Sequence, residues 1–187
     1  MNKTLKLLIL SDIFVFGGLG LINPIMAIFI KENLIGGTIA AVGIVSAIYL
    51  VTNSILQILF AKVFNPKDRF WMLCLGTFFI VLVPFGYIFS TKIWHIYLIE
   101  LIHGVGAGFA FPSWSSLFTS NLEKGARGYQ SSLHSAGVNM GMAITASSGA
   151  ILAQLFNFRV VFLITGCISL IGLLILFLLE KKNLKKF

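Results

Sequence analysis

Six long apolar stretches, separated by short charged segments, dominate this 187-residue chain and restrict what it can fold into. Each has at least the roughly 20 apolar residues that cross a bilayer. Their expected bounds are Leu5–Ile30, Gly36–Phe60, Phe70–Phe89, Ile93–Phe118, Ser131–Phe156 and Val160–Leu179. Lipid offers the backbone no hydrogen-bonding partner, so each stretch is expected to form a helix. Only 11% of the residues are charged, whereas soluble domains carry roughly 25%, so we predict an all-α membrane protein surrounded by the lipid bilayer.

The basic residues are distributed unevenly across the predicted membrane. Eleven of the 14 Lys and Arg residues lie before or at the very start of the first stretch, or after the second, fourth and sixth, and the other side holds Lys31, Lys92 and Arg159. Because basic loops stay cytoplasmic, both termini are expected in the cytoplasm, with the chain integral to the cytoplasmic (inner) membrane. The net charge of +8 follows from this distribution, and no nucleic-acid partner is predicted.

Four residues of the first stretch recur in the fourth stretch with the same spacing. The pairs, each 88 positions apart, are Asp12 with Glu100, Gly18 with Gly106, Gly20 with Gly108, and Pro24 with Pro112. Two copies of a three-helix unit have opposite topology, so the chain is predicted to be a single domain, 1–187, built as a 3+3 inverted repeat with units at about 5–89 and 93–179. Such repeats with acids inside the membrane are typical of transporters. The glycines and prolines are assigned to helix bending or packing.

The six stretches differ in polarity. Phe70–Phe89 and Val160–Leu179 contain almost no polar side chains and are expected to face lipid, whereas the other four are expected to face protein or water. His134 lies near an expected helix end and is assigned to hydrated surface. Tyr87, also near an end, is assigned to the aromatic belt at the membrane interface.

Polar side chains of the first and fourth stretches form the candidate site for a substrate or protons. Its members are Asp12, Asn23, Glu100, His103 and Trp114. A Glu–His pair three residues apart on a helix can share a proton near neutral pH, so Glu100 and His103 are expected to bind protons or a cationic substrate, with Asp12 as a second acid. The alternatives are a static hydrogen bond that orients the fourth helix, a hydrated or loop-paired Asp12, and a packing role for Trp114. The sequence suggests no soluble-enzyme chemistry, cofactor or metal.

Several motifs resemble the amino-terminal half of a major facilitator superfamily transporter. Gly20 and Pro24 resemble the first-helix glycine and proline of the drug/proton antiporter branch, and residues 42–49 resemble its second helix. Residues 102–112 resemble the fourth-helix motif, and residues 156–162 the joint before the sixth helix. The resemblance covers about Leu7 to Leu179 and implies the fold of one six-helix half.

The chain departs from the family pattern at three places. The loop after the second helix has Asn65 where the family has an acid, and Glu100 stands where the fourth-helix motif has Arg. The segment Gly137–Gly149 lacks the proline of the antiporter motif. The family motifs therefore do not by themselves imply proton coupling.

The family usually has two such halves, so a second copy of this chain, or a related half, is an expected partner. Polar and small side chains on the second and fifth helices are the candidate dimer contacts, with packing inside one chain as the alternative. They are Ser46, Tyr49, Asn53 and Gln57, and Gly137, Gly141, Thr145 and Gly149. The predicted function is a half-size secondary transporter, acting as a parallel homodimer on a small amphipathic or cationic solute, with proton coupling as a further hypothesis. The alternatives are a non-transporting subunit or scaffold and one half of a heterodimer.

Overall fold

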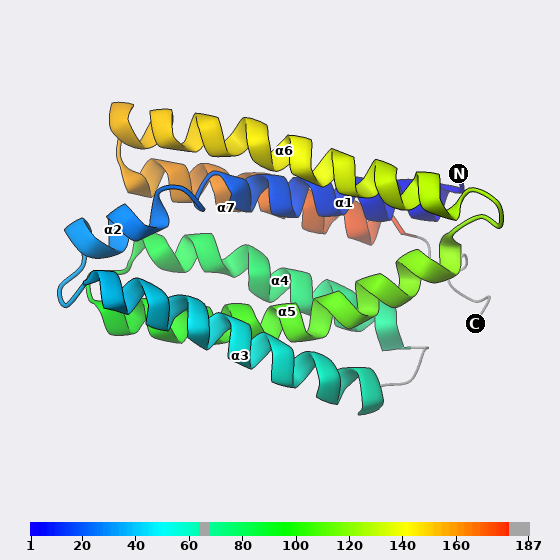
Figure 1. The fold of residues 1–187 in the computed structure, drawn as a ribbon, viewed down its shortest axis with the longest axis horizontal. Helices are drawn as coiled ribbons and strands as arrows, with labels where there is room; N and C mark the ends of the chain where they lie inside the picture. Colours follow the sequence, from blue (N-terminus) through cyan, green and yellow to red (C-terminus); the bar gives the residue numbers. More distant parts are fainter. Residues whose placement is uncertain (64–67, 180–187) are drawn as a thin grey trace.

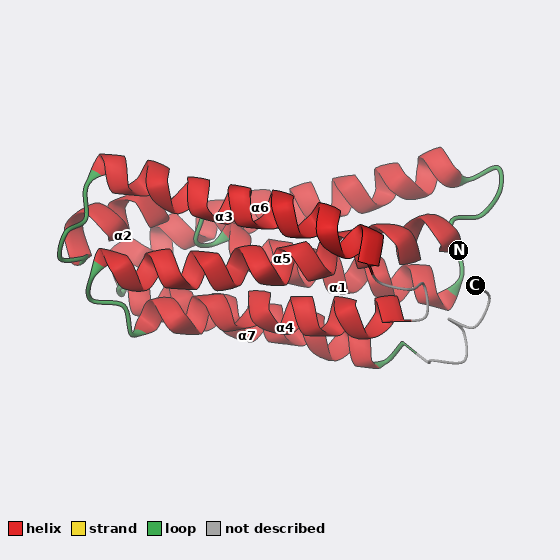
Figure 2. Ribbon diagram, turned by 90° about the horizontal axis from the view of Figure 1, so that it is seen from below, coloured by secondary structure: helices red, strands yellow, loops and turns green. Residues whose placement is uncertain are grey.

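The computed structural model describes residues 1–63 and 68–179, and within them the chain forms seven helices and no named strand. The helices are α1 (Lys3–Gly20), α2 (Met26–Asn33), α3 (Ile39–Val63), α4 (Arg69–Ile88), α5 (Ile93–Asn121), α6 (Arg127–Leu155) and α7 (Phe158–Phe177). They form one elongated bundle, seen from two directions in Figures 1 and 2. Five of them, α3 to α7, are long and apolar enough to cross a membrane. The predicted all-α membrane fold is confirmed, while the count of six spans stays a prediction.

The first apolar stretch is not one helix, which corrects the expected span Leu5–Ile30. Helix α1 ends at Gly20, a run of turns follows, and α2 begins at Met26. Pro24 explains the break, because proline has no N–H to donate and disfavours helical geometry in the residue before it. The repeated proline, Pro112, lies inside the continuous helix α5, so the two members of this pair have different effects.

Six of the seven described helices, all except α2, pack in two groups of three (Figure 1). Helix α5 packs against α3 and α4, helix α1 packs against α6 and α7, and α4 against α7 joins the groups. These groups are not the two sequential units at 5–89 and 93–179, because the first helix of each unit packs with the other two helices of the opposite unit. The predicted units are therefore interleaved in space.

The repeated glycines make matching close approaches in the two groups. A Cβ on Gly20 would lie 2.3 Å from Thr145 Oγ1, and one on Gly108 would lie 2.7 Å from Leu56 Cβ. Leu56 and Thr145 are themselves 89 positions apart. This match supports the interpretation of the chain as an internal repeat, whose inverted topology remains a prediction.

The two most apolar helices, α4 and α7, were expected to face lipid, but they are more buried inside the protein than α3 and α6. Over their most apolar segments, α4 and α7 are 56% and 50% buried inside the protein, whereas α3 and α6 are 17% and 6% buried. Helices α4 and α7 form the seam between the groups, although each also keeps exposed apolar side chains. An apolar side chain suits a protein contact and a lipid contact equally well, so apolarity alone does not distinguish them.

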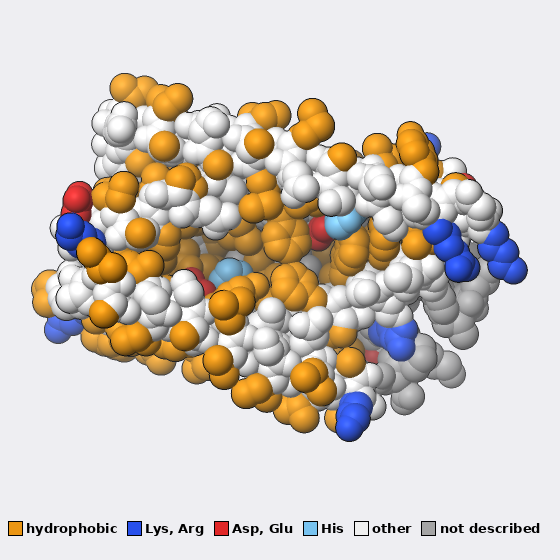
Figure 3. Space-filling view, in the orientation of Figure 1, with side chains coloured by type: hydrophobic (Ala, Val, Ile, Leu, Met, Phe, Trp, Pro, Cys, Tyr) orange, Lys and Arg blue, Asp and Glu red, His pale blue; other side chains and the backbone are white. Residues whose placement is uncertain are grey.

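Basic residues gather at the end of the bundle where α1 begins (Figure 3). Helix α3 ends there, α4 begins there, and α5 connects to α6 there, so Lys62, Arg69 and Arg127 lie at this end with Lys3 and Lys6. Lys31, Lys92 and Arg159 lie at the opposite end. The expected basic residues Lys67 and the C-terminal lysines, and also Asn65, fall outside the described residues.

Candidate functional site

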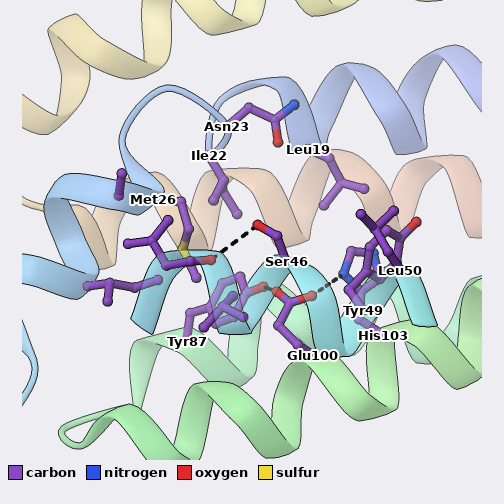
Figure 4. A pocket seen from close by; sticks show the side chains of 14 residues that line it. Leu19, Ile22, Asn23, Met26, Ser46, Tyr49, Leu50, Tyr87, Glu100 and His103 are labelled. Carbon is purple, nitrogen blue, oxygen red and sulfur yellow. Dashed lines mark hydrogen bonds and ion pairs between the residues drawn. The ribbon is translucent and has the colours of Figure 1, made fainter. Parts of the chain in front are cut away.

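A pocket of about 380 Å³ opens between the α1–α2 turn region and helices α3, α4 and α5. Figure 4 shows its labelled side chains, and Figure 3 shows a hollow in the centre of this face, between the two groups of helices. The wall from α1, the turn and α2 is mostly apolar. The opposite wall carries the ionisable and phenolic groups Tyr49, Tyr87, Glu100 and His103. The pocket is therefore an apolar cavity with polar groups concentrated on one side.

Glu100 is the centre of the polar wall. Its side chain is nearly buried, and its Oε1 accepts a hydrogen bond from the hydroxyl of Tyr87 on α4. Its Oε2 lies 3.2 Å from Nδ1 of His103, one turn further along α5. Helices α4 and α5 form an antiparallel pair joined by a short connection, which brings Tyr87 near the end of α4 beside Glu100 near the start of α5. Each carboxylate oxygen therefore has a partner within the protein.

The aromatic ring of Tyr49 packs beside the imidazole of His103. The rings of Tyr49 and His103 have centroids 4.4 Å apart and planes inclined by 34°. Both side chains line the pocket, and so does Asn23 in the turns between α1 and α2. A carboxylate beside aromatic faces is a favourable setting for an organic cation, because the negative charge and the ring quadrupoles attract it together.

Asp12 lies outside this pocket and belongs to a second polar pair. Its Oδ2 is 2.5 Å from Nε2 of His134 on α6, so the contact joins α1 to α6. The rings of Trp114 and Phe118 on α5 lie 4.5 and 5.2 Å from the His134 ring, measured between centroids. Asp12 and Trp114 also line a small hollow of about 20 Å³. This hollow is much smaller than the pocket beside Glu100.

The five predicted site residues therefore divide between two places. Glu100, His103 and Asn23 come together in the pocket, whereas Asp12 and Trp114 form the second site with His134. Sequence reasoning missed the contacts of His134 because the expected start of its helix was too late. Helix α6 begins at Arg127, which places His134 two turns inside. Tyr87 was assigned to an interfacial belt. It lies 13 positions before Glu100, and the short connection between their two helices could have indicated that the side chains meet across a helical hairpin.

The stripe of small residues on α6 packs against α1 of the same chain. A Cβ on Gly137 would lie 2.7 Å from Ile13 Cδ1, and one on Gly149 would lie 2.2 Å from the backbone oxygen of Leu21. Gly141 approaches Gly17, and Thr145 approaches Gly20. These contacts support the alternative of packing inside one chain, and a dimer contact at Gly137, Gly141 and Thr145, which are partly exposed, stays a prediction.

The four polar residues of α3 lie in different environments: two line the pocket, one is buried and one is exposed. Ser46 and Tyr49 line the pocket, and the Ser46 hydroxyl donates to the Val42 carbonyl oxygen 3.2 Å away. Asn53 is buried, and its Oδ1 has no hydrogen-bond partner in the described part of the chain. Gln57 is exposed and, of the four, is the side chain best placed to meet another molecule. Within residues 1–63 and 68–179, no group of three His, Cys, Asp or Glu side chains is placed to hold a metal ion.

Comparison with known proteins places this arrangement in a family. The sequence matches the Major Facilitator Superfamily over residues 8–187. It is 26% identical over 172 residues to multidrug resistance protein 2 of Bacillus subtilis, covering 91% of this chain and 42% of that protein. It is 23% identical over 161 residues to the uncharacterized MFS-type transporter MJ1560 of Methanocaldococcus jannaschii, covering 84% of this chain and 40% of that one. The chain thus spans about two fifths of the length of these relatives.

Two further comparisons agree. The quinolone resistance protein NorA of Staphylococcus aureus is 20% identical over 172 residues, covering 92% of this chain and 44% of NorA. The crystal structure of the POT family transporter PepTSo superposes with a TM-score of 0.74 over 95% of this chain and 37% of PepTSo, at 18% identity, which supports the fold alone. Because the family match covers nearly the whole chain, this integral membrane protein belongs to the Major Facilitator Superfamily, a family of transporters and not of enzymes.

Proposed function

We propose that this chain is a half-size secondary transporter that moves a small amphipathic or cationic solute as a parallel homodimer. In this proposal the solute binds in the pocket beside Glu100, with His103, Tyr49 and Asn23 around it. Asp12 and Trp114 then act at the second site, away from the solute. Both termini are proposed to lie in the cytoplasm, because basic residues gather at the end of the bundle where α1 begins.

The observation that carries the proposal is a nearly buried carboxylate facing a pocket in a membrane-spanning bundle. An ionisable group at membrane depth is expensive, and it is usually retained for a substrate or ion. The side chain of Glu100 is 9% exposed, and its two oxygens contact two other titratable groups, Tyr87 and His103. A chain of such groups can exchange a proton for a cation, which supports proton coupling. Two relatives named for multidrug and quinolone resistance favour an amphipathic solute.

The homodimer is supported by the position of the pocket on one face of the bundle. The hollow lies between the two groups of helices, and the flanking helices α3 and α6 leave apolar side chains exposed, such as Ile44, Ile55, Met140 and Ile144. A second copy, related by an axis along the membrane normal, would cover the hollow and enclose a cavity with two copies of Glu100. Exposed apolar surface here also suits lipid, so the oligomeric state requires its own measurement.

The experiment is uptake of the lipophilic cation tetraphenylphosphonium into proteoliposomes that contain the full chain. We expect accumulation above that of empty vesicles, and a change in rate when a pH gradient is imposed. Glu100→Gln is isosteric and removes the charge, so it is expected to abolish the accumulation. Uptake that survives both Glu100→Gln and Asp12→Asn would refute the assigned acids.

The oligomeric state is measured separately, as the native mass of the protein in lipid nanodiscs and in mild detergent. A dimer supports the two-copy cavity. A monomer under every lipid condition removes the homodimer and favours a partner of related sequence or a role without transport. Tetraphenylphosphonium transport together with a monomeric mass would retain the pocket and reject the dimer.

A further inference from the structure

We propose that the basic end of the bundle holds a binding site for the phosphate of an anionic phospholipid headgroup, between Arg69 and Arg127. A groove of about 440 Å³ is lined by these two arginines together with Ser116, Thr119 and Ser120 of α5. This site is separate from the Glu100 pocket and does not depend on the transport proposal. An arginine presents several N–H donors in a planar fork, which matches the oxygens of a phosphate group.

Neither arginine has a carboxylate partner among the described residues. The ion pairs within the described residues join Met1 to Glu123, His103 to Glu100, and His134 to Asp12. No hydrogen bond from either guanidinium group occurs within residues 1–63 and 68–179. Two cations that have no carboxylate partner in the described part of the chain repel each other across one groove, and an anion between them would remove that repulsion.

A buried hydroxyl adjoins the groove and has no hydrogen-bond partner among the described residues. Ser113 is 1% exposed, and its Oγ makes no hydrogen bond in the described structure. It lines a hollow of about 60 Å³ that shares Arg69 and Ser116 with the larger groove. A buried hydroxyl without a partner is costly, and one that faces an arginine-lined hollow is satisfied when an oxyanion or its bound water occupies that hollow.

The two arginines also stand at helix starts that no side chain caps. Arg69 is the first residue of α4 and Arg127 the first residue of α6, and neither N-cap residue, Asp68 or Ala126, forms a side-chain cap hydrogen bond. In contrast, Asn2 and Asn157 cap α1 and α7. The N–H groups and dipoles of these two helix starts favour an anion in the groove, and the C-terminal end of α5, whose Thr119 and Ser120 line the same groove, opposes them in part.

The surrounding charges leave the groove positive. Asp68 is exposed at the start of α4, and Glu123 lies after α5, where it contacts the Met1 ammonium at 2.7 Å and accepts from Gln130 at 3.0 Å. Lys124 lies beside Glu123 in the same connection. With Arg69 and Arg127, three basic side chains thus face two acidic ones, of which Glu123 already has a cationic partner.

The position of the groove favours a lipid over a free anion. Helices α4 and α6 begin there and α5 ends there, and all three are long and apolar enough to cross a membrane, so a bilayer around them would place the groove near the headgroups. Basic pockets between helices at the cytoplasmic side are suited to anionic lipid phosphates, and this end is the one expected to be cytoplasmic. The groove is open, so a headgroup can enter it while its acyl chains stay in the bilayer.

The test is native mass spectrometry of the full chain in detergent, titrated with phosphatidylglycerol or with phosphatidylcholine. We expect tight binding of phosphatidylglycerol alone, weakened about fivefold by Arg69→Gln and about fivefold by Arg127→Gln. Ser113→Ala changes no charge and is expected to weaken binding less than either arginine variant. Thermal unfolding of each variant in the same detergent shows that the loss is not a loss of fold.

Two matched controls locate the effect. Arg159→Gln removes an arginine from the start of α7 at the other end of the bundle, and Lys124→Gln removes a basic residue close to the groove. Arg159→Gln is expected to bind phosphatidylglycerol as the unmodified chain does. Lys124→Gln is expected to weaken binding far less than either groove arginine variant, because Lys124 adds nearby positive charge but does not line the groove. An equal loss in either control would overturn the site in favour of diffuse charge attraction, as would equal binding of phosphatidylcholine. A last titration adds inorganic phosphate at millimolar concentration to the lipid-bound protein. If phosphate displaces the lipid equally from the unmodified chain and from the two arginine variants, the proposal is overturned.

Discussion

The two carboxylates Asp12 and Glu100 occupy equivalent positions in the sequence repeat but differ in their surroundings. Glu100 contacts Tyr87 and His103 inside one group of helices and faces a pocket of about 380 Å³. Asp12 contacts His134 across two helices and lies beside a hollow of about 20 Å³. The comparison teaches that an acid at a corresponding position can either face a solute or tie helices together. Its partners and the free space beside it decide which role is possible.

The largest expected difference is in transport. Glu100→Gln is expected to lower tetraphenylphosphonium uptake to the rate of empty vesicles, because it removes the charge that attracts the cation. Asp12→Asn is expected to retain uptake, since Asp12 does not line the pocket. Initial rates in proteoliposomes with matched protein content measure this contrast. Equal loss in both variants would mean that the two sites act as one.

The next largest effect is expected on stability at the Asp12 site. The side chains of His134 and Asp12 are only 19% and 14% exposed, so His134→Ala leaves a mostly buried carboxylate without its partner. Such a change costs about 3 kcal/mol. The double variant Asp12→Asn with His134→Ala is expected to recover most of that loss, because no charge remains unpaired. Thermal unfolding in detergent measures the stability of both single variants and the double variant. If the two single losses of stability simply add in the double variant, the contact between Asp12 and His134 does not hold α1 against α6.

A close backbone contact between α6 and the end of α1 provides a third test, this time of the packing of these two helices. A Cβ on Gly149 would lie 2.2 Å from the backbone oxygen of Leu21, so Gly149→Ala is expected to destabilise the protein by about 2 kcal/mol through forced separation of the helices. Gly43→Ala is the matched control, since nothing lies within 4 Å of its added Cβ. That control is expected to gain about 0.5 kcal/mol from reduced chain entropy. A Gly149→Ala variant as stable as the control would show that α6 is not held closely against α1.

The smallest effect is expected from Tyr87→Phe. The change removes one hydrogen bond to Glu100 and leaves the contact with His103. A hydrogen bond to a charged group contributes about 1.5 kcal/mol, so unfolding is expected at a modestly lower temperature. Transport is expected to persist, with an altered apparent affinity for the cation. Complete loss of uptake with normal unfolding would instead place Tyr87 among the groups that transfer a proton.

The sequence was sufficient to predict the fold class, and it placed five helices within a few residues of their observed bounds. The repeated glycines, the pairing of Glu100 with His103, and the basic end of the bundle followed from spacing and charge. It did not predict the break between α1 and α2, where the local effect of Pro24 outweighed a continuous apolar run. Interleaving of the two units was also inaccessible, because periodicity within a helix carries no information on which helix packs beside it.

The site was predicted in parts for a similar physical reason. A helical wheel places Asp12 and Asn23 on one face, but the turns after Gly20 remove Asn23 from that helix and bring it to the Glu100 pocket. His134 is distant in sequence from Asp12, and only the packing of α6 on α1 brings them together. The small-residue stripe on α6 suggested a close helix contact correctly, without identifying which helix it contacts.

The interleaving of the units has a consequence for how the protein is made. The Ser11 hydroxyl of α1 donates to the Gly172 carbonyl oxygen of α7, and 161 positions separate them. At ribosomal speeds of about 5–20 residues per second, α1 leaves the ribosome roughly 10–30 s before the last of its packing partners. During that interval α1 must remain in the membrane or with the insertion machinery. Asp12 lacks its partner until His134 of α6 has been synthesised. Helix α1, which is synthesised well before α6 and α7, therefore waits longest for its final neighbours.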